Sequence, residues 1–192
     1  MQRHSRLTQV CTVVIVLTLA VFLFGPGTVA AQDVAVGQAT ATVLTMLTVT
    51  ATMALKFGDV MQGVRKVMGK NVIEGGGMSS GIFTITGAVS TEVSCYLQLP
   101  DYLWNATNED RLVIAFSSTD GLIDTTAAGT PGVPGGGLGA VDQDPHNLPE
   151  FDLNDVGGIG KIYLGGTVWP TVDQRNSTYS ADIILTVAYT GN

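Results

Sequence analysis

Apolar and polar residues alternate over a long stretch between Ala39 and Phe57. Its odd positions are apolar except for Thr45, whereas its even positions carry mainly threonine. Side chains of a β-strand alternate between two faces, so the pattern predicts an extended ribbon with one apolar and one threonine side. At roughly 3.4 Å per residue the ribbon would reach about 65 Å, whereas a domain of this size is about 40 Å across. The ribbon must fold back or leave its domain, and our leading hypothesis is a strand that completes a neighbouring subunit.

Shorter alternating runs fill most of the remaining chain, separated by glycine, proline or Asn-Asp clusters, and helical periodicity is nearly absent outside the first residues. This pattern is typical of an all-β sandwich or barrel. The predicted strands are residues 39–57 in two pieces, 71–74, 81–86, 92–99, 111–117, 151–153, 160–168 and 178–189. The second piece of the ribbon, residues 47–57, is the predicted first strand of the domain. Residues 125–150 are rich in glycine and proline and predict a long loop. The strongly alternating strands near the two termini are a natural pair, in which the strand at the chain start of one molecule is available to another.

The first 31 residues have the pattern of a cleaved signal peptide. Arg3 and Arg6 precede an apolar stretch at 13–24, and the small residues 29–31 follow a Gly-Pro break. The apolar stretch is shorter than the roughly 20 residues that span a bilayer. Cleavage before Gln32 would leave no membrane span and seven basic against sixteen acidic residues, a net charge of −9. That charge argues against nucleic acid as a partner.

Candidate chemistry is sparse in the mature chain. Cys95 is its only cysteine and lies in an alternating run, which favours a small buried hydrophobe over a reactive thiol. His146 is its only histidine, so no nucleophile and base can be assembled elsewhere, and we expect neither an enzyme nor a cofactor. The acidic stretch near residue 146 has oxygen ligands of the kind calcium prefers, although a solvated loop explains the same residues. The candidate calcium ligands are Asp142, Asp144, Asp152 and Asp155.

Two further groups of residues have alternative interpretations. Tyr102 and Trp104, beside Pro100, could stack on a sugar ring, although such aromatics more often cap the core of a sandwich. Arg65, Lys66 and Lys70 form the sole basic cluster of the mature chain. They fit a solvated face or a contact with the acidic loop of a neighbouring copy.

Five segments in order along the chain resemble the domain of unknown function 4402, which groups with fimbrial pilin-like and spore coat U-like secreted domains. They are residues 55–60, 83–87, 96–100, 164–168 and 178–189, and together they span most of the mature chain. The resemblance implies export and an immunoglobulin-like antiparallel β-sandwich. In the pilin relatives it also implies donor-strand complementation, in which the N-terminal extension of one subunit fills a groove left by a missing strand in the next.

Carried onto this chain, the resemblance makes residues 32–45 the donor extension and residues 46–192 the sandwich domain. The donor side chains would be Val34, Val36, Ala39, Ala41 and Val43. The strand beside the acceptor groove would present Ile183, Leu185, Val187 and Tyr189. We place the joint near Leu44 and Met46, where apolar residues interrupt the threonine side. Two alternatives remain open, namely that the extension folds onto its own domain or is a disordered arm.

The function expected from these observations is a structural subunit of an extracellular, pilus-like surface filament whose partners are copies of itself. A subunit that lacks a strand exposes an apolar groove that aggregates unless protected. The sequence leaves open whether an assembly chaperone and usher are needed. The alternative is a monomeric secreted or surface-attached binding module or adhesin of the same fold.

Overall fold

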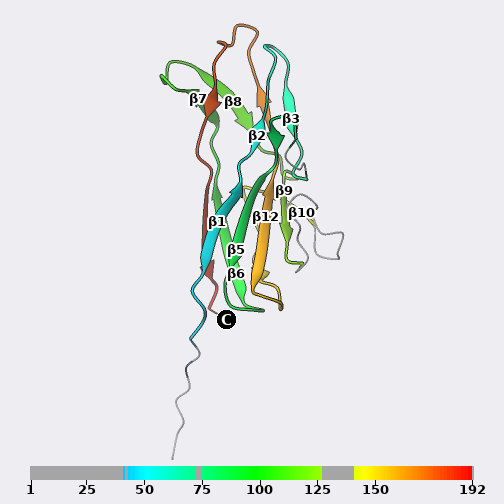
Figure 1. Cartoon of the computed structure of the whole chain (residues 1–192), viewed down its shortest axis with the longest axis vertical. Coiled ribbons are helices and arrows are strands. Elements are labelled where there is room, and N and C mark those ends of the chain that lie inside the picture. The colour runs from blue at the N-terminus through cyan, green and yellow to red at the C-terminus, as the bar shows by residue number, and fades with distance from the viewer. Residues whose placement is uncertain (1–40, 42, 72–74, 127–140, 192) are drawn as a thin grey trace, which may run out of the picture. The chain divides into compact units, whose positions relative to one another are not determined.

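The computed structural model describes residues 41, 43–71, 75–126 and 141–191, and the chain divides into two units, Met1–Thr42 and Val43–Asn192. Every element assigned in the described residues is a β-strand, and all strand pairs are antiparallel (Figure 1). The second unit is therefore all-β, with several antiparallel sheets, and is consistent with a β-sandwich. The predicted signal peptide and most of the predicted donor extension lie outside the described residues.

Three sheets and one short pair of strands make up this unit. Sheet 1 has five strands in the order β1, β5, β12, β9 and β10 (Thr48–Met53, Gly81–Thr86, Ile159–Leu164, Gly121–Asp124 and Val141–Gln143). Sheet 2 has three, β11, β6 and β15 (Phe151–Asp152, Glu92–Gln98 and Ile184–Tyr189). Sheet 3 has five, β14, β7, β8, β13 and β3 (Tyr179–Ser180, Tyr102–Asn105, Arg111–Ala115, Gly166–Trp169 and Lys66–Met68). The short strands β2 and β4 (Lys56–Phe57 and Met78–Ser79) pair with each other.

Sheets 1 and 2 share one hydrophobic core. Alternate residues of β5, β12 and β9 meet the buried side chains of β6, as the strand period of two requires. The buried members of this core are Phe83, Ile85, Val93, Leu97, Ile123, Leu153, Ile162 and Leu164. A second core lies on the inner face of sheet 3, where Phe57 of β2 packs against Met68, Leu112, Ile114 and Val168.

The threonine side of the N-terminal ribbon is confirmed over β1. Thr52 and Thr84 join β1 and β5 through their hydroxyls at 2.7 Å, and Thr48 donates to the Thr86 carbonyl. A register irregularity between Ala51 and Met53 then ends the simple alternation, because it pairs Met53 with Ile82 on the opposite face of sheet 1.

Four predicted strands are confirmed, namely β5, β6, β8 and β11, with ends shifted by at most two residues. Three predictions of a single strand were wrong. Residues 47–57 form β1 and β2, residues 160–168 belong to β12 and β13, and residues 178–189 form β14 and β15. Each break carries the chain from one sheet to another, which alternation alone does not reveal.

Gly165 shows why one of these breaks occurs. Gly165 lies between β12 and β13, and a Cβ at this position would lie 2.5 Å from the carbonyl oxygen of Met68 at the end of β3. Only glycine therefore permits the backbone of β3 to pass so close. The sequence also failed to predict β3, β4, β7, β9 and β10. Strand β9 is buried throughout its four residues, so it lacks the alternating pattern of a half-exposed strand.

Gly158 provides a test of the packing between the β5–β6 and β11–β12 connections. Its carbonyl accepts a hydrogen bond from the Gly87 amide, and a Cβ on Gly158 would lie 2.1 Å from the Gly87 carbonyl oxygen. Both Gly158 and Gly76 have positive φ, but a Cβ on Gly76 would meet nothing within 4 Å. We expect Gly76→Ala to cost about 1 kcal/mol of unfolding free energy, from backbone strain alone. Gly158→Ala should cost several times more because the clash adds to that strain, and equal losses in urea titrations would contradict this packing.

Candidate functional site

The candidate site is an open strip between two strand edges. Among the described residues, β1 pairs only with β5, and β15 pairs only with β6. β1 and β15 therefore do not pair with each other within one molecule, and within the described ranges each has a strand partner on one side and none on the other. Pairing of the N-terminal ribbon of one copy with β15 of another stays a prediction. Edge strands of this kind present rows of unpaired N–H and C=O groups that can accept another strand.

The core is uncovered along this strip. Val49 of β1 stands opposite Ile85 and so lies on the inner face of sheet 1, yet it is 40% exposed whereas Ile85 is fully buried. On the other side of the strip, Leu185 and Val187 of β15 also contact the first core and are only half-buried. In a closed sandwich these inward side chains would be buried, so the exposed apolar strip lies where one further strand would cover it.

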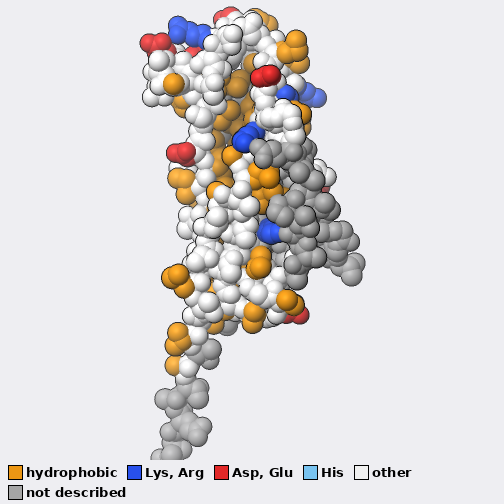
Figure 2. All heavy atoms as spheres, viewed as in Figure 1, with side chains coloured by type: hydrophobic (Ala, Val, Ile, Leu, Met, Phe, Trp, Pro, Cys, Tyr) orange, Lys and Arg blue, Asp and Glu red, His pale blue; other side chains and the backbone are white. Residues whose placement is uncertain are grey.

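The strip widens into a pocket of about 890 Å³ between β2 and the segment before β15. Leu55 and Phe57 line it on the β2 side, and Tyr179 lines it on the β14 side. Apolar side chains of sheet 3 form its floor, namely Leu103, Leu112, Ile114 and Val168. Figure 2 shows orange side chains sunk between paler rims in the upper part of the view.

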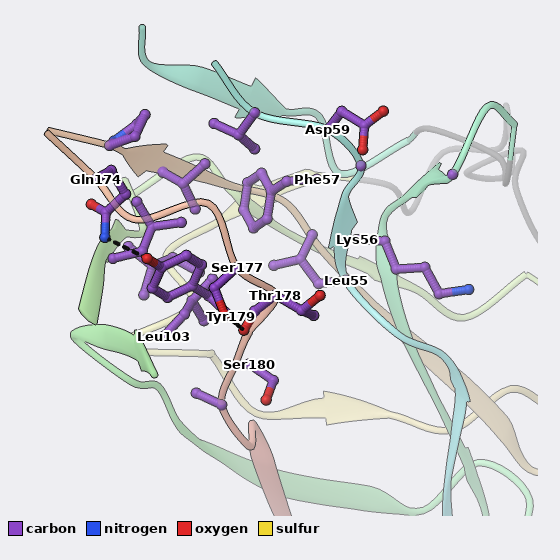
Figure 3. Close-up of a pocket in the computed structure, with 18 of the residues that line it drawn as sticks. Leu55, Lys56, Phe57, Asp59, Leu103, Gln174, Ser177, Thr178, Tyr179 and Ser180 are labelled. Carbon is purple, nitrogen blue, oxygen red and sulfur yellow. Dashed lines mark hydrogen bonds between the residues drawn. The ribbon is translucent and has the colours of Figure 1, made fainter. Parts of the chain in front are cut away.

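Figure 3 shows how the labelled residues are oriented. Leu55, Phe57, Leu103 and Tyr179 lie around one common space, whereas the Lys56 side chain extends away from it. The polar lining comes mainly from the segment 174–180, which follows the rim. An apolar floor with polar rims accepts apolar side chains and leaves main-chain groups at the rim for hydrogen bonding.

A hydrogen-bond network holds the rim at Tyr179. The Tyr179 hydroxyl donates to Asp110 Oδ2 at 2.5 Å, and Gln174 Nε2 donates to the same oxygen at 2.9 Å. The Tyr179 hydrogen bond is the main cause that lowers the pKa of Asp110, because it stabilises the ionised carboxylate. Burial of Tyr179 and its bond to Asp110 in turn raise the pKa of the Tyr179 hydroxyl. The network ties the rim segment to the hairpin of β7 and β8.

A second tyrosine holds the other end of the strip. The Tyr189 hydroxyl accepts a hydrogen bond from the Ala88 amide at 2.7 Å and donates one to the Thr45 carbonyl at 2.8 Å. A Cβ on Gly87 would lie 2.4 Å from that hydroxyl, so glycine leaves room for it. Thr45 lies in the joint predicted for the extension, and Tyr189 therefore fixes the backbone where the chain enters the domain.

The predicted acceptor strand lies at this strip. Leu185, Val187 and Tyr189 belong to β15 and Ile183 precedes it; all four pack against the first core, and Ile183 also lines the pocket. Of the predicted donor residues, Val34, Val36 and Ala39 lie outside the described residues. Ala41 is exposed and Val43 is 93% exposed. The pocket floor and the Asp110 network were not predicted from the sequence, because their residues come from segments that lie far apart in the chain.

The candidate calcium ligands are not brought together. Within the described ranges no three acidic, histidine or cysteine side chains form a group able to hold a metal ion. Asp142 instead pairs with Lys70 at 2.7 Å, and Asp144 accepts a hydrogen bond from the His146 amide in a local turn. Asp152 belongs to β11, and Asp155 lies in the turn that follows it. The basic cluster therefore meets the acidic loop through Lys70 within one molecule.

Cys95 lies on β6 and is partly buried against the first core. Burial raises the pKa of its thiol to about 12, which keeps it protonated and weakly nucleophilic at neutral pH. Cys95 therefore packs as a small hydrophobe rather than serving as a reactive group.

In comparisons with known proteins, no family model, no curated protein and no solved structure matches this chain. In the part of the chain that the structure describes, no helix is long and apolar enough to cross a membrane. The geometry of the strip and pocket is therefore the basis for assigning a function.

The Tyr179 network predicts a specific pH dependence of stability. The lowered pKa of Asp110 means that the unfolded chain binds a proton at higher pH than the folded chain does. The ionised Asp110 carboxylate therefore stabilises the folded chain. This contribution to the free energy of unfolding is present above the unfolded carboxyl pKa of about 4 and is lost as pH falls through the folded pKa. Tyr179→Phe should make the acid-side loss of stability shallower, as measured by thermal melting between about pH 2 and 6.

Tyr189→Phe is the matched control, because it also removes one hydrogen-bonded hydroxyl but its described partners are backbone groups. It should lower stability to a similar extent across that pH range. An identical acid slope for Tyr179→Phe and the parent protein would rule out the role assigned to this network.

Proposed function

We propose that this chain is a structural subunit of an extracellular filament, joined by insertion of residues 32–45 of one copy into the open strip of the next. The observation that carries the proposal is the pair of unpaired edges, β1 and β15, on either side of an uncovered apolar strip. An inserted strand would satisfy both rows of main-chain groups at once and cover the core between them.

The composition of the extension supports this occupant. Its apolar side chains form two short alternating stretches, Val34 with Val36 and Ala39 with Ala41 and Val43. The two stretches have opposite phase, so they face the same side only if the strand bulges between them. Gly37 stands at that point, and glycine accommodates such a bulge readily.

Energetics favour a slowly dissociating junction. Burying a valine side chain contributes about 1.5 to 3 kcal/mol, less for alanine, before the entropy of ordering the strand is subtracted. Main-chain hydrogen bonds on both edges must open together for the strand to leave, which slows release. The exposed Val43 and Met46 side chains, 93% and 78% exposed, show that these residues find no cover on their own domain.

The resemblance to the domain of unknown function 4402 supports the same proposal, and with it an immunoglobulin-like topology, export and a location on the cell surface. In the proposed assembly the main partner is a second copy of the chain. An assembly chaperone would protect the apolar strip before insertion. The alternative of a monomeric binding module predicts that the extension is dispensable.

The test is assembly with and without the extension. The exported protein should form a ladder on an unboiled denaturing gel and fibres under negative stain, whereas a deletion of residues 32–43 should run as a monomer. A synthetic peptide of residues 32–45 should raise the melting temperature of the deleted protein, because it fills the strip. A monomer with unchanged melting after deletion, and no response to the peptide, would refute the proposal.

A matched pair of substitutions distinguishes the two sides of the inserted strand. Ala41→Asp would place a carboxylate in the apolar strip, at a cost of several kcal/mol, and should abolish the ladder. Thr42→Asp, on the opposite side of the strand, should leave the ladder intact. Equal effects would show that the extension does not insert with this alternation.

A further inference from the structure

A second surface lies on the outer face of sheet 3, opposite the pocket floor. Tyr102, Val113 and Trp169 stand side by side on β7, β8 and β13, because Tyr102 pairs with Val113 and Val113 pairs with Trp169. The next row pairs Trp104 with Arg111. We call this surface the aromatic face; its members are Arg65, Tyr102, Trp104, Arg111, Val113 and Trp169.

The aromatic face is exposed. Trp104 is 40% and Trp169 is 45% exposed, and Val113 between them is also exposed. The inner neighbours on the same strands, Leu112 and Val168, are buried in the second core. The aromatic residues therefore do not cap the core, and both tryptophans of the chain lie on a surface that solvent reaches.

Two arginines lie on these rings. The Arg111 guanidinium carbon is 4.2 Å from the centre of the Tyr102 ring, and that of Arg65 is 5.5 Å from the centre of the Trp169 ring. A guanidinium held against a ring keeps its N–H groups available at its edge, in the fork that binds a carboxylate through two hydrogen bonds.

The charge of this face is opposite to that of the chain. Its two arginines are accompanied by no carboxylate among the described members of the face, whereas the whole chain carries a net charge of −7. The acidic groups of the β7–β8 hairpin have other partners: Glu109 pairs with Arg175, and Asp110 binds Tyr179. The aromatic face is thus suited to an anionic occupant with flat apolar surfaces.

We propose that the aromatic face binds an acidic polysaccharide whose sugar units carry carboxylates. The C–H face of a sugar ring is attracted to the electron-rich face of Trp and Tyr, while its carboxylate can pair with a neighbouring arginine. Tyr102 and Trp169 are two strand spacings apart, about 10 Å, which suits a chain of sugars lying across the strands. This site is separate from the strip and does not require filament assembly.

The experiment uses the exported protein and two probes, oligogalacturonate and oligomannuronate, with the neutral oligosaccharide maltohexaose as a control. Because both tryptophans lie on the aromatic face, their intrinsic fluorescence reports its occupancy directly, and calorimetry gives the affinity. At least one uronate should shift the fluorescence and bind at least about tenfold more tightly than maltohexaose. Its affinity should fall as salt is raised.

Substitutions then locate the site. Trp104→Ala and Arg111→Gln should each weaken uronate binding about tenfold or more, and Arg111→Lys should restore only part of the loss because it keeps the charge but not the fork. Tyr96→Ala is the matched control, since Tyr96 is an exposed aromatic on β6, outside this face. Melting temperatures close to that of the parent protein would show that the variants fold.

The proposal is overturned if neither uronate shifts the fluorescence at millimolar concentration, or if Tyr96→Ala weakens binding as much as Trp104→Ala. It is also overturned if Trp104→Ala and Arg111→Gln change only the sedimentation of the protein. That result would identify a second copy of the chain as the occupant of the face. Deletion of residues 32–43 should leave uronate binding unchanged, so failure of either proposal can be told from failure of the other.

Discussion

The requirement that a strand edge find hydrogen-bond partners governs this molecule. In the part of the chain that the structure describes, the first and last strands of the domain, β1 and β15, are each paired on one side and unpaired on the other. Between them no strand of the described residues covers the core, and Val49 remains exposed although its cross-strand neighbour Ile85 is fully buried. Unpaired backbone and uncovered apolar surface occur together, and one inserted strand would relieve both. The proposed subunit function rests on this coincidence.

Two tyrosines hold the strip at its ends by different chemistry. Tyr179 binds the Asp110 carboxylate and thereby ties the rim of the pocket to the β7–β8 hairpin. Tyr189 binds only backbone groups among its described partners and fixes Thr45, where the chain enters the domain. A strip with such fixed rims loses little conformational entropy when it is filled, which favours tight binding.

Sheet 3 has different chemistry on its two faces because side chains alternate along its strands. Leu112 and Val168 form part of the pocket floor, whereas Val113 and Trp169, their neighbours in the chain, belong to the aromatic face. In the proposed filament, each inserted strand would join one more subunit to the polymer, and each subunit would carry one aromatic face. Weak binding of one sugar segment would then be reinforced by many copies, since linked sites raise the effective concentration of the ligand.

The sequence alone determined the class of the fold and several of its strands. Period-two alternation predicts the all-β fold, as well as β5, β6, β8 and β11, because half-buried strands must alternate. The same pattern predicted which residues of β15 lie on its apolar side. It also predicted that Cys95 packs as a small hydrophobe.

Only the tertiary structure decided where strands break and which of them meet. Gly165 separates β12 from β13 because another backbone passes close to it, and the Ala51–Met53 irregularity changes the exposed side of β1. The pocket joins β2, β7, β8, β13 and β14, and the aromatic face joins β7, β8 and β13. Local pattern reports the two sides of one strand, but the pairing of strands far apart in the chain decides which side chains become neighbours.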